Sequence, residues 1–188
     1  MRVRAEIRES HHKDVIKAAS RLLRLKGVEG LSIAVLMRSE GMTHGGFYRH
    51  FKSKTALVEA AIDDMFAPFI KMVIEDAKSL GPGEAVNRYV DRYLSADHVA
   101  HPEMGCPIAA FSTEALRLKF PARKAFAAHV AKLKDGLARG LKPATHETAD
   151  ALLSLLVGAV VLARSAPDAE TATRGLKAAR RHAQTFLN

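Results

Sequence analysis

Side chains able to hydrogen-bond a nucleic acid are concentrated between residues 43 and 54. They carry hydroxyl, imidazole, guanidinium and ammonium groups, contributed by Thr43, His44, Tyr48, Arg49, Lys52 and Lys54. Phosphate oxygens accept hydrogen bonds from all of these groups, and arginine also donates to base edges in the major groove. The residue types therefore predict a surface that contacts the backbone and bases of a duplex, with the two lysines acting as point charges on the backbone.

The elements that must position these groups are two short helices. Apolar spacing predicts one helix from Leu31-Ser32 to about Gly41 and a second from Thr43 to about Phe51. Glu40-Gly41-Met42 joins them, and such a short connection containing glycine is typical of a helix-turn-helix. Thr43 is a suitable N-cap for the second helix.

The second helix has an apolar side and a polar side. Phe47 and Phe51 lie four residues apart, so we expect both to pack inward. The outward residues are then His44, Gly45, Tyr48 and Arg49.

Gly45 and Gly46 stand side by side in this helix. Each glycine costs about 1 kcal/mol of helix stability relative to alanine. Missing side chains would let the helix sink into a major groove, with its N-terminal amides near phosphate. The alternative is a solvated basic surface helix with a flexible glycine pair. The coincidence of turn, cap, aromatic pair and basic flank favours the groove.

The distribution of charge agrees with a polyanionic partner. The chain has 29 Lys and Arg against 20 Asp and Glu, a net charge of +9. Residues 1–60 hold 12 of the basic and 6 of the acidic residues, so this third of the chain carries +6 of the total. We therefore expect the N-terminal third to bind the anionic surface.

The segment LSIAVLMRSEGMTHGGFYRHFKSK, residues 31–54, resembles the DNA-binding signature of the TetR family of regulators. The matched positions are Gly41, Met42, Thr43, Gly45, Phe47, Tyr48, Phe51, Ser53 and Lys54. The resemblance implies phosphate contacts from Ser32, Thr43, Tyr48 and Lys54, and places His44, Gly45 and Arg49 at or near base edges. His44 and Gly46 differ from the residues that are common at these positions in the family. The operator sequence therefore cannot be inferred by analogy.

The whole chain is predicted to be all-α. Apolar periodicity and cap residues predict nine helices, over about 10–27, 31–41, 43–51, 53–80, 84–96, 107–118, 121–140, 145–164 and 168–187, with an irregular stretch over 97–107. The layout resembles the family throughout. It implies a DNA-binding domain over residues 1–52 and a helical ligand-binding and dimerisation domain over residues 53–188.

Aromatic and sulfur-containing residues are the candidates for a ligand pocket in the second domain. They are Phe66, Phe69, Tyr89, Tyr93, Met104, Cys106, Phe111 and Phe126. Taken one at a time, each is more easily explained by core packing. Together they indicate an apolar or aromatic effector.

Cys106, the single cysteine, has a second interpretation. It precedes a predicted helix N-terminus, which would lower the thiol pKa and suit a sensor of oxidants or electrophiles. A small buried residue at a tight turn is the simpler explanation. His98, His101 and Cys106 have loose metal-ligand spacing without a fourth ligand, so no metal and no cofactor are predicted.

The last two helices are predicted to form the interface of a homodimer. Small residues on the first (Ala151, Ser154, Gly158, Ala159) permit close approach, and Leu176, Ala179, Ala183, Phe186 and Leu187 give the second an apolar face. The alternative is that both faces are buried within one subunit. A dimer presents two recognition helices to a palindrome.

The sequence predicts a cytoplasmic, ligand-responsive repressor that binds double-stranded DNA. No nucleophile–base pair, metal signature or phosphate loop indicates an enzyme. The alternatives are a redox-sensing regulator acting through Cys106 and an architectural protein that binds DNA nonspecifically. A 13-residue apolar run over 151–163 is shorter than the roughly 20 residues of a membrane span, so it predicts a buried helix.

Overall fold

The computed structural model describes residues 2–187, which form helices and no strand. There are nine α-helices within these residues: α1 (Arg2–Lys26), α2 (Ile33–Ser39), α3 (Lys54–Leu80), α4 (Pro82–Tyr93), α5 (Ala96–Ala100), α6 (Pro107–Ala115), α7 (Phe120–Ala138), α8 (His146–Arg164) and α9 (Ala169–Ala183). Two short 3-10 helices, η1 (His44–Arg49) and η2 (Gln184–Phe186), complete them. The all-α prediction is confirmed.

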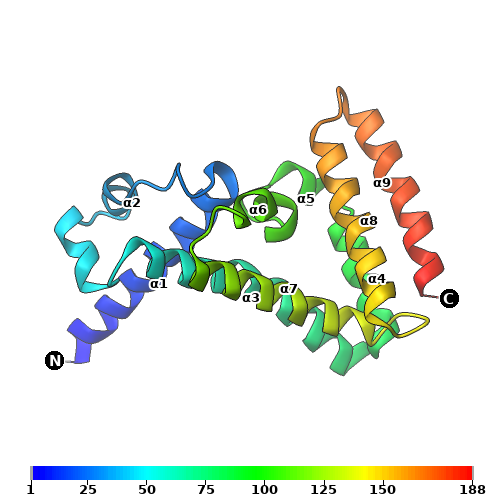
Figure 1. Cartoon of the computed structure of the whole chain (residues 1–188), viewed down its shortest axis with the longest axis horizontal. Coiled ribbons are helices and arrows are strands. Elements are labelled where there is room, and N and C mark those ends of the chain that lie inside the picture. Colours follow the sequence, from blue (N-terminus) through cyan, green and yellow to red (C-terminus); the bar gives the residue numbers. More distant parts are fainter. Residues whose placement is uncertain (1, 188) are drawn as a thin grey trace.

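The molecule is elongated, with α1, α2 and η1 at one end and the α8–α9 hairpin at the other (Figure 1). The long helix α3 connects the ends and packs against α1, α4 and α7. Its apolar face supplies buried residues along most of its length, from Leu57 to Val73. Because α3 contacts both halves, it is the element through which a change at one end can reach the other.

Side-chain caps and glycines set several helix boundaries. Ser53 accepts a hydrogen bond from the Ala56 amide at the start of α3, and Thr145 does the same for Thr148 at the start of α8. Gly81, at φ 84°, ends α3, and Pro82 begins α4 at once. These sequence signals placed most helix ends within a few residues.

Three predicted elements were wrong in detail. The third helix is 3-10 rather than α, since two consecutive glycines in six residues weaken the α-helical alternative. The stretch 97–107 is not wholly irregular, because Ser95 caps the short helix α5. The first helix does not begin after Ser10; it begins at Arg2, and Ser10 hydrogen-bonds Asp14 within it.

Helix α8 is long and apolar enough to cross a membrane by length and composition alone, with a mean hydropathy of 1.5. It packs against α7 and α9 and contributes buried residues such as Leu152 and Leu156 to the core. Core helices of soluble proteins share these properties, so the feature is weak evidence for a span.

Candidate DNA-binding surface and ligand cavity

The turn between α2 and η1 has the geometry that a helix-turn-helix requires. Gly41 adopts φ 72°, a left-handed conformation that glycine takes without steric cost. Thr43 is extended, and its hydroxyl accepts a hydrogen bond of 3.3 Å from the Gly46 amide. The backbone therefore turns sharply and enters η1 with a satisfied cap.

Aromatic packing fixes which side of η1 faces outward. Phe47 is fully buried, Phe51 is 5 % exposed, and their ring centroids lie 5.5 Å apart. Tyr48 packs edge-on against Phe47 yet remains 65 % exposed. The inward orientation predicted for the two phenylalanines is confirmed, as is the exposure of His44, Gly45, Tyr48 and Arg49.

The fold itself does not demand the glycine pair. A Cβ atom on Gly45 would meet nothing within 4 Å. On Gly46 it would make only ordinary contacts, with Thr43 Oγ1 at 3.5 Å and Met37 Cε at 3.8 Å. The absence of side chains here serves no packing inside the subunit, so it leaves an outer surface open to close approach.

The remaining residues predicted to contact DNA differ in their exposure and in the hydrogen bonds that they already make within the subunit. Lys52 is exposed. Ser32 is exposed but caps α2 by accepting a hydrogen bond from the Val35 amide. Lys54 is half-buried, and its ammonium donates to the Val28 carbonyl at 3.0 Å. Lys54 thus ties the start of α3 to the loop after α1, whatever else it contacts.

A histidine pair beside η1 was not singled out in the sequence. The His12 ring of α1 stacks on Phe51 at 4.6 Å and lies 5.9 Å from the His50 ring. Arg8, Arg49 and both histidines line a shallow polar groove there. Burial, followed by the nearby imidazoles and guanidinium groups, lowers the pKa of His50. Only the fold brings these residues of α1 and η1 together.

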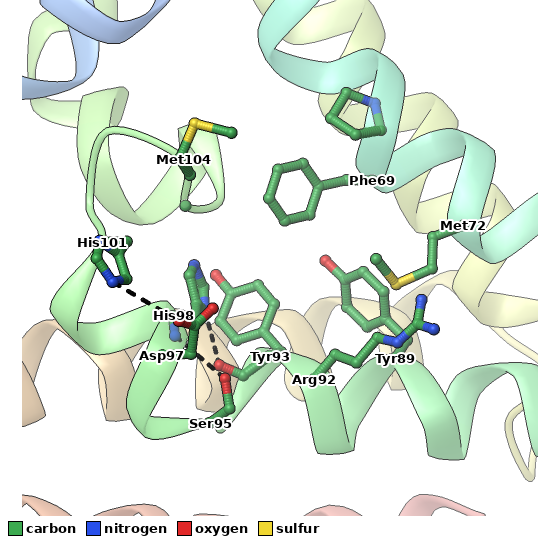
Figure 2. A pocket seen from close by; sticks show the side chains of 12 residues that line it. Phe69, Met72, Tyr89, Arg92, Tyr93, Ser95, Asp97, His98, His101 and Met104 are labelled. Carbon is green, nitrogen blue, oxygen red and sulfur yellow. Dashed lines mark hydrogen bonds and ion pairs between the residues drawn. The ribbon is translucent and has the colours of Figure 1, made fainter.

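A cavity of about 250 Å³ lies between α3, α4 and the segment around α5 (Figure 2). Its wall is mostly apolar, and polar groups gather on one side. The lining residues are Pro68, Phe69, Met72, Tyr89, Arg92, Tyr93, Ser95, Asp97, His98, His101, Met104 and Gly105. The cavity is slightly below the usual range of small-molecule sites.

The structure divides the predicted pocket residues into two groups. Phe69, Tyr89, Tyr93 and Met104 line the cavity. The others do not line it: Phe66 and Phe111 pack on Phe126 at centroid distances of 5.1 and 6.0 Å, and Cys106 is fully buried beside Tyr93. The sequence did not indicate Met72, Arg92 or Ser95, because nothing in their spacing sets them apart from other surface and core residues.

His98 holds the polar side of the cavity in place. Its Nδ1 lies 2.6 Å from the Tyr93 carbonyl, and its Nε2 accepts the Cys106 amide hydrogen at 2.8 Å. This pattern requires the neutral tautomer with a proton on Nδ1. Burial lowers the pKa of His98 and favours that neutral form. Since both ring nitrogens are engaged, His98 is not arranged to bind a metal, and no group of three or more potential ligands is found among the described residues.

The Cys106 thiol is fully buried, and burial raises its pKa. The simpler explanation, a small buried residue at a tight turn, agrees with this burial. The alternative of a thiol pKa lowered at a helix N-terminus does not, because desolvation of the thiolate outweighs the neighbouring donors. A buried, protonated thiol reacts slowly with oxidants and electrophiles.

A second hollow follows the α8–α9 hairpin. Small and apolar residues of both helices line it, including Ser154, Gly158 and Ala159 of α8 and Gly175 and Ala178 of α9. The apolar face predicted for α9 has another use: Leu176, Ala179 and Ala183 are buried within the subunit. The part of α9 that borders the hollow is thus a neighbouring stripe of smaller residues, including Gly175 and Ala178.

Comparisons with known proteins agree with this geometry. The sequence profile described as "Bacterial regulatory proteins, tetR family" matches residues 15–61, which span the second half of α1, the turn, η1 and the start of α3. A TetR transcriptional regulator from Chloroflexus aurantiacus superposes with a TM-score of 0.70 at 26% identity, over 95% of this chain and 94% of its own.

This chain thus carries a TetR-family DNA-binding region over residues 15–61. At the level of fold it is also similar to E. coli NemR in its reduced form, with TM-score 0.78 and 18% identity over 95% of this chain and 97% of that one. A TetR-family regulator from Cytophaga hutchinsonii gives TM-score 0.76 and 20% identity, with 94% of each chain covered. No curated protein sequence matches the chain.

This match, together with the shared fold, makes the protein a DNA-binding transcriptional regulator rather than an enzyme. The segment that carries the match holds Gly41, Thr43, Phe47 and Tyr48, the residues that shape the helix-turn-helix. The family assignment and the local geometry thus rest on the same stretch of chain.

Proposed function

We propose that this TetR-family protein is a cytoplasmic repressor that binds a palindromic operator as a homodimer and leaves it when a small apolar effector fills the cavity. The proposal is supported by two features that α3 connects. An exposed 3-10 helix with two glycines, η1, precedes the start of α3, and an apolar cavity lies against α3 farther along its length. Residues 1–52 then form the DNA-binding domain, and residues 53–188 the regulatory domain.

The outward face of η1 is proposed to enter the major groove. Arg49 and His44 would reach base edges, and Tyr48 and Thr43 would donate to phosphates. Gly45 and Gly46 would allow the backbone of η1 close to the duplex. Ser32, Lys52 and Lys54 lie at the two flanks of the motif, where backbone phosphates would pass.

The α8–α9 hollow is proposed as the dimer interface. A two-fold axis through it would bring Gly158 and Ala159 of one protomer against the same surface of its partner, forming a four-helix bundle. Its position at the end opposite η1 leaves both DNA-binding domains free to face one duplex (Figure 1).

Effector release is proposed to act through α3. Phe69 and Met72 line the cavity, and Lys54 at the other end of the helix holds the loop before α2. The 15 residues from Lys54 to Phe69 correspond to about 22 Å of helix. A small tilt of α3 at the cavity would therefore change the spacing of the two recognition elements.

A titration tests the regulatory part of the proposal. Operator DNA from upstream of the gene is held at half-saturation with protein, and small aromatic compounds are added singly. An effector should release DNA from wild type and release much less from Phe69→Trp, which fills the cavity from α3 without touching η1. Failure of every bound compound to change DNA affinity would refute regulation through this cavity.

The redox alternative has no observation in its favour. Cys106 is buried and its pKa is raised, so the structure supplies no exposed thiolate for an oxidant to attack.

A further inference from the structure

Two tyrosine hydroxyls in the cavity have no ordinary hydrogen-bonding partner. Tyr89 and Tyr93 are 1 % and 3 % exposed, and neither hydroxyl oxygen meets a partner within the described chain. The Cys106 thiol lies beside the Tyr93 hydroxyl, but a thiol is a weak partner. Buried hydroxyls are normally satisfied, so two unsatisfied ones in a single site call for an explanation.

Both hydroxyls are aimed at the same region. Tyr89 and Tyr93 lie one turn apart on α4, with ring centroids 5.6 Å apart, and both hydroxyls point away from α4 to the side where Phe69 and Met104 lie (Figure 2). Phe69 and Met72 of α3 and Met104 of the opposite segment surround that region. Two donors therefore lie side by side under an apolar cover formed by flexible side chains.

We propose that the effector is an uncharged aromatic molecule with a carbonyl oxygen, which accepts hydrogen bonds from Tyr89 and Tyr93 while its ring packs among Phe69, Met72 and Met104. This inference rests on the proposed function, because it names the chemistry of the ligand expected in that cavity. Methionine and phenylalanine side chains can shift to admit a flat ring. The volume of about 250 Å³ suits a compound of one or two rings.

The charges around the cavity favour a neutral ligand. Arg92 is the cationic side chain of the lining nearest the tyrosines in sequence, and its guanidinium already lies 4.0 Å from the Asp76 carboxylate. Asp97 and His101 lie on the opposite rim and face each other at 3.7 Å. His98 is held neutral by its two hydrogen bonds. Arg164, a further cation near Tyr93, donates to the His98 and Val99 carbonyls. Among the residues that line the cavity, a carboxylate would therefore meet no cation without an acidic partner, and it would lose its hydration.

Three probes of nearly equal shape separate the alternatives. They are 2-acetonaphthone, with a ketone; 2-isopropenylnaphthalene, with a methylene group in place of the oxygen; and 2-naphthoate, with an anion. Binding to the DNA-free, full-length protein is measured by equilibrium dialysis or calorimetry. We expect the ketone to bind at least about tenfold more tightly than the hydrocarbon and than the carboxylate.

Conservative variants assign the preference to the hydroxyls. In the Tyr89→Phe/Tyr93→Phe double variant the ketone should bind within about threefold of the hydrocarbon, while hydrocarbon affinity stays unchanged. Tyr48→Phe, an exposed tyrosine on η1, is the matched control and should keep the full preference. The double variant should unfold at about the same temperature as wild type or higher, since it loses only two buried hydroxyls that lack a strong hydrogen-bonding partner.

Several results would overturn the inference. These are equal binding of ketone and hydrocarbon, stronger binding of the carboxylate, no binding of any probe, or a preference that survives in the double variant. The measurement contains no DNA, so it is independent of the repressor proposal. A ketone that binds through the tyrosines without releasing DNA would refute the regulatory proposal and leave the assignment of ligand chemistry intact.

Discussion

Replacing Gly158 by leucine should separate the dimer without unfolding the subunit. Gly158 lies in the middle of α8 and lines the α8–α9 hollow. A Cβ atom built on it meets nothing within 4 Å in the subunit. Leucine is favoured over glycine inside a helix by roughly 0.5–1 kcal/mol, so the isolated subunit should gain slightly in stability.

The stability of the dimer, in contrast, should decrease. In the proposed interface the partner's α8 approaches this position closely, and an inserted side chain in a packed contact costs about 1–3 kcal/mol. Two-fold symmetry repeats the change, giving a total of about 2–6 kcal/mol. The dimer dissociation constant should therefore rise by a factor of about 30 or more.

Sedimentation equilibrium over a range of protein concentrations measures this constant, and circular dichroism checks that helix content is retained. Ala131→Leu, on the exposed side of α7, is the control for added apolar surface and should dimerise like wild type. A Gly158→Leu protein that dimerises as tightly as wild type, or more tightly, would refute the placement of the interface.

Three further results are expected. Arg49→Ala should weaken operator binding by roughly 1–3 kcal/mol and relax base preference, measured by anisotropy on operator and single-base variants; an unchanged preference would exclude base contact by Arg49. Gly140→Ala should destabilise the fold by about 1–3 kcal/mol in urea unfolding, because its Cβ would lie 2.2 Å from the Pro82 carbonyl oxygen; no loss would show that this contact relaxes freely. Burial lowers the pKa of His98, so the unfolded chain binds more protons than the folded one, and the free energy of unfolding should fall as pH drops below about 6.5. His98→Gln should remove part of that fall. An identical pH profile in the variant would contradict the role given to His98.

The DNA-binding end was readable from sequence because its signals are local. Phe47 and Phe51 are four residues apart, Thr43 caps the backbone three residues ahead, and Gly41 takes the positive φ of the turn. Each of these depends on neighbours in the chain alone. The exception is the 3-10 form of η1, which reflects a small balance between two helical geometries.

The cavity was only partly predictable because it is made by packing between distant segments. Phe69 and Tyr89 were expected to line it from their residue types, yet Phe66 and Phe111 are of the same type and lie in the core. Helical periodicity shows that a residue faces inward, but not whether it meets another side chain or a space. The α5 segment that supplies His98 was missed because five residues carry too little periodic signal.

The sequence also did not predict whether the apolar face of α9 packs against its own subunit or against a partner. Leu176 and Ala179 form an apolar stripe, and a stripe looks the same whether its own subunit or a partner covers it. The structure shows that the subunit covers it, because both residues are buried. The uncovered hollow beside them holds Gly175 and Ala178, whose small side chains gave only a weak signal.

Fluorescence anisotropy gives the most direct test of whether η1 binds a specific duplex. Labelled DNA from upstream of the gene and a scrambled duplex of the same composition are titrated with the full-length protein at about physiological salt. We expect a preference of roughly a thousandfold or more for the native duplex, with two protomers bound per duplex. Equal affinity for both duplexes would contradict it, and would instead indicate binding to the phosphate backbone alone.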